Sequence, residues 1–161
     1  MVSTDNLRFN FSPAAVTYPS TTEQVVAVVA LGSSENLQIV ARSGGHNYIA
    51  NGLGGKNGAI VIDLSNMTRV DIDASSGTAT IETGNRLRDV AFALNNQAME
   101  AALTGRISFG TAGGGFGFAS RMWGLTLDTV QSMTVVLANS TIVTASSTSI
   151  HWSMASVTSK P

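Results

Sequence analysis

The sequence has no cysteine among its 161 residues, which excludes disulfide bonds, thiolate metal ligands and cysteine nucleophiles. It has only two histidines, His46 and His151, and their wide separation argues against a histidine-rich metal centre, so we expect no metal. Charged residues make up 12% of the chain, and the net charge is −1. Because the few lysines and arginines are scattered, we also expect no nucleic-acid partner and no membrane partner.

Long hydrophobic runs are missing as well. No stretch approaches the roughly 20 apolar residues of a membrane span. The first residues do not combine a charged segment with an apolar one, so no secretion signal is visible, and by default we expect a cytoplasmic location. Apolar residues nevertheless form 43% of the chain, which is enough to build the core of one ordinary domain.

The alternation of apolar and turn residues predicts an α+β domain. A strand, a helix over residues 23–31 and a second strand near residues 38–41 form a β-α-β arrangement, with a parallel pair early in the chain. Further strands are predicted at residues 59–64, 69–73, 78–82, 132–138 and 141–145, the last four as hairpins. A second helix is predicted at residues 86–95. Residues 147–161 are rich in serine and threonine, and we predict a disordered or aberrant tail there.

A glycine turn directly after the second predicted strand is the most informative segment. It reads Arg42-Ser43-Gly44-Gly45-His46-Asn47-Tyr48. The two glycines allow a sharp turn and a close approach to a ligand, and successive N–H groups in such a turn can form a phosphate-binding concavity. His46 adds a nucleophilic imidazole beside it. The alternative is a solvated loop that binds nothing, since glycine turns are common.

Two more glycine turns lie near predicted strands, at Gly84 and at residues 113–117. Three such turns favour a long anionic ligand, such as a dinucleotide, laid across several loops. The segment that begins at Gly115 superficially matches the nicotinamide-binding G-x-G-x-x-G pattern. However, residues 121–126 look like a turn where a helix should follow, and Asp128 comes too early to contact a ribose, so the sequence argues against a nicotinamide site.

Several ordered motifs resemble the PCMH-type FAD-binding domain of the vanillyl-alcohol-oxidase superfamily, in particular fungal berberine-bridge-enzyme-like and glucooligosaccharide oxidases. The resemblance covers residues 6–146, which we expect to be the domain. The motifs that match the family are Leu7-Arg8-Phe9-Asn10, the turn at residues 41–48, Gly52-Leu53-Gly54-Gly55, Gly114-Gly115-Phe116-Gly117 and residues 120–128. It implies two α/β lobes, a small parallel-strand lobe and an antiparallel-sheet lobe, in incomplete form.

The resemblance also implies a cofactor, FAD, and the residues that bind it. The backbone of the first turn would hold the pyrophosphate, and His46 would be joined covalently to the flavin 8α-methyl group. Gly84 would contact the cofactor, a second loop would follow, and the backbone of Val143 would lie near the adenine. The implied cofactor-binding residues are Arg42, Ser43, Gly44, Gly45, His46, Asn47, Gly84, Gly114, Gly115, Gly117 and Val143.

The departures from the family pattern limit what we expect. The segment at residues 105–114 is shorter than in the family, and without cysteine a second covalent flavin link is impossible. The family's substrate domain and catalytic base have no counterpart here, and its members are commonly secreted. We expect the FAD-binding domain of an oxidoreductase that oxidises an alcohol or carbohydrate hydroxyl with oxygen as acceptor. We expect it in a truncated form that lacks the substrate domain, binds FAD weakly or not at all, and has no full oxidase turnover. The alternatives are a non-catalytic flavin-binding or interaction module and a non-functional gene fragment.

Overall fold

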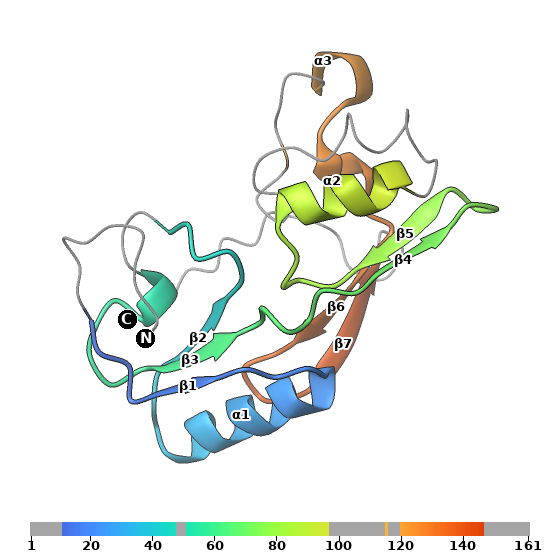
Figure 1. Ribbon diagram of the computed structural model, residues 1–161. Coiled ribbons are helices and arrows are strands. Elements are labelled where there is room, and N and C mark those ends of the chain that lie inside the picture. Colours follow the sequence, from blue (N-terminus) through green and yellow to red (C-terminus); the bar gives the residue numbers. More distant parts are fainter. Residues whose placement is uncertain (1–10, 48–50, 97–114, 116–119, 147–161) are drawn as a thin grey trace.

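The computed structural model describes residues 11–47, 51–96, 115 and 120–146 (Figure 1). Three small sheets and the helices packed on them make up this part of the chain. The strands are β1 (Ala15–Thr17), β2 (Ile39–Arg42), β3 (Ile60–Asp63), β4 (Val70–Asp73), β5 (Thr78–Ile81), β6 (Ser132–Val136) and β7 (Ile142–Ser146). The helices are α1 (Thr22–Ser34), α2 (Leu87–Asn96) and α3 (Ser120–Trp123), with 3-10 turns η1 (Asn51–Leu53) and η3 (Thr126–Thr129).

The first sheet is parallel and has the strand order β1-β3-β2. All four residues of β3 are buried, as expected for the central strand of a parallel sheet. Helix α1 lies along this sheet (Figure 1). It approaches closely at Gly32, where an added β-carbon would stand 2.5 Å from Cγ1 of Ile39. The core therefore sits around β3 and includes Val29 of α1 and Leu53 of η1.

Strands β4 and β5 form one antiparallel hairpin, and β6 and β7 form another. In the β4–β5 turn, the carboxylate of Asp73 accepts hydrogen bonds from the backbone and hydroxyl of Ser75 and from the hydroxyl of Ser76, and Gly77 takes a positive φ of 67°. In the β6–β7 turn, Oδ1 of Asn139 accepts from the backbone N–H of Thr141 at 3.1 Å. Both turns use the side-chain-to-backbone bonds that such residues favour.

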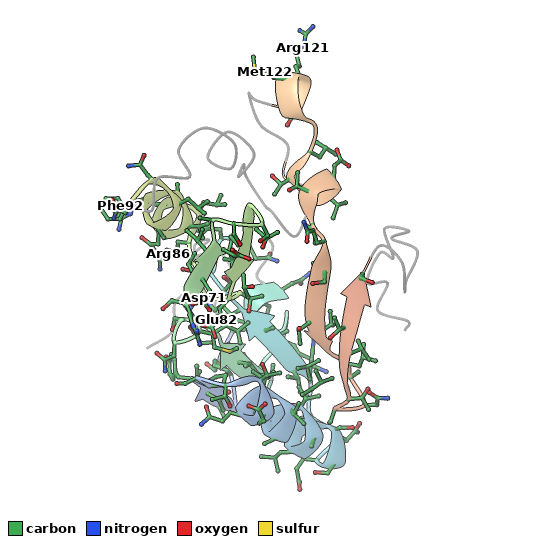
Figure 2. The ribbon with its side chains drawn as sticks, turned by 90° about the vertical axis from the view of Figure 1, so that its right-hand side faces the viewer. Asp71, Glu82, Arg86, Phe92, Arg121 and Met122 are labelled. Carbon is green, nitrogen blue, oxygen red and sulfur yellow. The ribbon has the colours of Figure 1, made fainter. Side chains whose placement is uncertain are left out.

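Helix α2 packs against the β4–β5 hairpin through Val90 and Leu94, which are buried. Its opposite face carries Phe92, which is 67% exposed and points away from the protein, as does Met122 of α3 (Figure 2). No helix in the described part of the chain is long and apolar enough to cross a membrane.

The predicted α+β class is confirmed, with three differences in detail. The parallel sheet places β3 between β1 and β2, so the two strands of the β-α-β arrangement are not neighbours. Residues 121–126 are not simply a turn, since a helical turn runs to Trp123 and ends at Gly124, whose φ is +77°. The helix predicted over residues 23–31 is longer in the structure, where α1 runs from Thr22 to Ser34.

Candidate functional site

The glycine turn begins where β2 ends, at an edge of the parallel sheet where β3 ends as well. Arg42 is the last residue of β2 and pairs in register with Asp63, the last residue of β3. The backbone N–H of Leu64 donates to the carbonyl of Arg42 at 2.8 Å. The turn therefore stands at the carboxyl ends of parallel strands, where open α/β sheets place their ligands.

The second glycine turn meets the first at this edge, although about 40 residues separate them. The hydroxyl of Ser43 donates to the carbonyl of Thr83 at 2.6 Å. The N–H of Gly84 donates to the carbonyl of Met67 at 2.9 Å, and an added β-carbon on Gly84 would overlap the carbonyl oxygen of Leu64. Gly84 is therefore required for this close approach, and the structure brings Arg42, Ser43 and Gly84 together.

The turn has two features that an anion-binding loop requires. Gly45 has a φ of +75°, which favours glycine. Among the described residues, no hydrogen bond engages the backbone N–H of Gly44 or of Gly45. The exposed side chain of His46 lies beside Gly44, because a β-carbon on Gly44 would be 3.1 Å from Cδ2 of the imidazole. Asn47 follows and lies near Gly52 of η1.

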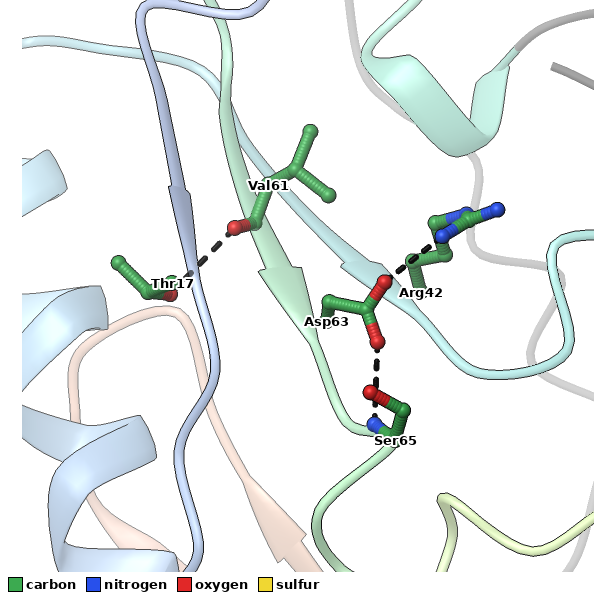
Figure 3. A network of polar contacts seen from close by, with 5 residues as sticks. All are labelled: Thr17, Arg42, Val61, Asp63 and Ser65. Carbon is green, nitrogen blue, oxygen red and sulfur yellow. Dashed lines mark hydrogen bonds and ion pairs between the residues drawn. The ribbon is translucent and has the colours of Figure 1, made fainter. Parts of the chain in front are cut away.

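Below the turn lies an ion pair that sequence reasoning missed (Figure 3). Nη1 of Arg42 is 2.7 Å from Oδ2 of Asp63, and Asp63 is only 4% exposed. Burial acts to raise the pKa of Asp63, but hydrogen bonds from Ser65 and the charge of Arg42 outweigh it and lower that pKa below its ordinary value. Asp63 lies within the strand predicted at residues 59–64, and the structure makes it the buried last residue of β3.

Two further predicted residues, Gly115 and Val143, lie in other segments of the described chain. Gly115 is buried against η3, where its carbonyl accepts from the N–H and the hydroxyl of Thr126 at 3.3 Å each. Val143 is half-buried in β7, paired with Val135. Gly114 and Gly117 lie outside the described residues.

A phosphate-bearing cofactor fits this edge of the sheet. Within the described segments the N–H groups of Gly44 and Gly45 have no hydrogen-bond partner, the glycines allow a close approach, and the guanidinium of Arg42 lies against Gly45. In the described part of the chain, no group of three or more histidine or acidic side chains could hold a metal ion. The arrangement suits binding through backbone amides and a cation, with an imidazole at one end.

The comparisons with known proteins agree with this geometry. A family model described as an FAD binding domain matches residues 13–146, so the chain belongs to that family. It is 40% identical to glucooligosaccharide oxidase from Sarocladium strictum over 89% of its own length, and 32% identical to reticuline oxidase from Eschscholzia californica over 81%. A solved structure of glucooligosaccharide oxidase from Acremonium strictum superposes with a TM-score of 0.81 at 38% identity, covering 91% of this chain.

The chain spans only part of these relatives. It covers 30% of the Sarocladium oxidase, 26% of the reticuline oxidase and 32% of the solved Acremonium chain. The predicted fold, its family and its cofactor, FAD, are confirmed by these matches. The individual cofactor-binding residues and the domain bounds at residues 6–146 stay predictions.

Proposed function

We propose that this chain is the FAD-binding part of an oxidoreductase that oxidises an alcohol or carbohydrate hydroxyl with oxygen as acceptor. The observation that carries the proposal is the turn after β2, whose Gly44 and Gly45 N–H groups are unengaged among the described residues and which is joined through Ser43 to the Gly84 segment. Three relatives are named as oxidases of glucooligosaccharide, chitooligosaccharide and xylooligosaccharide, which favours a carbohydrate substrate.

In this proposal the N–H groups of Gly44 and Gly45 bind the FAD pyrophosphate, and Gly84 keeps the neighbouring backbone close. FAD held there would supply the redox chemistry, the two-electron oxidation of a hydroxyl with oxygen as the final acceptor. Gly114, Gly115 and Gly117 would form the second cofactor loop, and Val143 would contact the adenine end. In this proposal the protein binds the cofactor and holds it in one orientation.

His46 is proposed as the covalent anchor of the flavin. An imidazole nitrogen would bond to the 8α carbon, while that carbon and the imidazole each lose one hydrogen and oxygen takes up both as hydrogen peroxide. The solved Acremonium oxidase is described as carrying 6-S-cysteinyl, 8α-N1-histidyl FAD. This chain has no cysteine, so only the histidyl bond is available to it.

Acid precipitation of the purified full chain after incubation with FAD and oxygen tests the anchor. We expect a yellow precipitate that keeps its flavin, and its loss in His46→Ala. His151→Ala is the matched control, since it removes the only other histidine, and should keep the flavin. Flavin retained by His46→Ala would overturn the anchor, and a folded wild-type chain that binds no FAD would overturn the proposed function.

Turnover is tested separately with gluco-, chito- and xylo-oligosaccharides. We expect flavin binding without substrate-dependent peroxide release, because no catalytic base is assigned among the residues of this chain. Such a result fits a flavin-binding module. Peroxide release that depends on the sugar would contradict this expectation and would show that the chain carries a base of its own.

A further inference from the structure

We propose that Asp63 is a positioning residue of the FAD site: it acts through Arg42 to fix the glycine turn that binds the pyrophosphate. The inference rests on the proposed function, because it assumes that the turn holds the pyrophosphate. It assigns a role to a residue of β3 that lies outside the turn itself.

The first step is the position of the Asp63 carboxylate. It ends β3, its side chain is 5% exposed, and its two oxygens take different partners (Figure 3). Oδ1 accepts from the backbone N–H of Ser65 at 3.1 Å, and Oδ2 pairs with Nη1 of Arg42 at 2.7 Å. A buried carboxylate held from two sides has little freedom to move, so it is a fixed point for the guanidinium.

The second step is the position of the Arg42 guanidinium relative to the turn. A β-carbon placed on Gly45 would be 2.5 Å from Nη2, 2.8 Å from Nε and 2.9 Å from Cζ of Arg42. The guanidinium thus lies directly over the α-carbon of Gly45, while its other end pairs with Asp63. One planar group therefore connects the buried carboxylate to the turn, as the rigid fork of arginine allows.

The third step is the electrostatic result. Asp63 fixes where the positive charge of Arg42 stands, and that charge lies against Gly45, one of the two glycines of the turn. A phosphate at the turn would meet two amide donors and a nearby cation at once. Without Asp63, the guanidinium would lose the buried carboxylate that orients it over Gly45.

Binding of ADP to the full chain, purified free of flavin, tests this role. ADP carries the pyrophosphate but has no flavin methyl group that could react with His46. We expect Asp63→Asn to weaken ADP binding by roughly tenfold, measured by calorimetry, as is typical when a hydrogen bond to a charged group is lost. Asp71→Asn is the matched control, because it removes an exposed partner of Arg69, and it should bind ADP as the wild type does.

A double-mutant cycle separates positioning from general damage to the fold. If Asp63 acts through Arg42, then Asp63→Asn has no further effect on ADP binding once Arg42→Gln is present. Additive losses would overturn the inference, as would wild-type affinity in a folded Asp63→Asn variant. If Asp63→Asn does not fold, the Arg42→Lys variant tests the inference instead. Lysine keeps a cation beside Asp63 but lacks the planar guanidinium, so we expect a folded chain with weakened ADP binding.

Wild-type affinity in Arg42→Lys would also overturn the inference. A folded wild-type chain that binds neither ADP nor FAD has a different meaning. It would overturn the proposed function first, and the role of Asp63 only as a consequence.

Discussion

The parallel sheet and the β4–β5 hairpin contain ion pairs of equal length in different surroundings. Arg42 and Asp63 lie 2.7 Å apart with side chains 21% and 5% exposed, and Arg69 and Asp71 lie 2.7 Å apart with side chains 74% and 51% exposed. The first pair is sheltered from solvent and the second is screened by it. The distance between the charged atoms therefore does not tell which ion pair contributes more to stability, whereas the burial of the side chains does.

The same contrast extends to the strands. Strand β3 is buried along its whole length, but β4 and β5 are half-buried or exposed at every residue. Parallel strands are covered on both faces, while an antiparallel hairpin can leave one face in water. The buried core thus lies under the glycine turn, and the turn that we propose to bind the cofactor follows the more buried sheet of the described chain.

The largest effect should come from opening a cavity in the parallel sheet. Ile62 is 1% exposed, so Ile62→Ala should lower the free energy of unfolding by about 2–5 kcal/mol. Ile142, at 47% exposed on β7, offers the matched control, and Ile142→Ala should cost only about 0.5 kcal/mol. Urea unfolding of both variants measures the difference. Equal losses would show that the two regions are packed alike.

A pair of glycines with similar backbone angles sharpens the comparison. Gly45 and Gly77 have φ values of +75° and +67°, so alanine at either position should cost about 1–2 kcal/mol for the backbone alone. Only Gly45 is covered, by the Arg42 guanidinium, since nothing lies within 4 Å of a β-carbon on Gly77. We expect Gly45→Ala to lower the melting temperature more than Gly77→Ala does. The reverse order would contradict the close contact with Arg42.

Local patterns made most elements predictable. The helix predicted from residue 23 is present as α1, and the hydroxyl of Thr21 caps it by accepting from the N–H of Gln24. The apolar run at residues 59–64 does form the buried strand β3. Both hairpins lie where turn residues separate alternating segments. Each of these depends on neighbours within a few positions, and such information is present in the chain itself.

Contacts between distant segments were not predictable in the same way. Nothing local indicates that β3 inserts between β1 and β2, that Ser43 bonds to Thr83, or that Arg42 faces Asp63. One signal was available: Arg42 and Asp63 both follow apolar runs, so both belong at the carboxyl ends of strands. The glycine turn could be singled out in the sequence because its residues are consecutive. The ion pair beneath it could not, because Asp63 belongs to another strand.

Acid should destabilise the β4–β5 hairpin through Asp73, with a smaller effect than the substitutions above. Hydrogen bonds from Ser75 and Ser76 lower the pKa of Asp73 from 3.8 to about 2. Because the folded pKa lies below the unfolded one, the stabilisation is complete above pH 3.8 and is lost as the pH falls toward about 2. We expect amide exchange in β4 and β5 to accelerate in this pH range. Asp73→Asn should remove that dependence in the hairpin, and an unchanged pH profile in this variant would contradict the assignment.

The smallest effect should come from the exposed pair of the β4–β5 hairpin. In Asp71→Asn, Arg69 loses a partner but keeps its hydration, so no buried charge is left uncompensated. We expect the melting temperature to stay within experimental error of the wild type, at low and at high salt. In Asp63→Asn the removed carboxylate is buried, so the half-buried Arg42 guanidinium would lose an ion pair that is sheltered from solvent. A fall in melting temperature for Asp71→Asn as large as that for Asp63→Asn would mean that burial does not separate the two pairs.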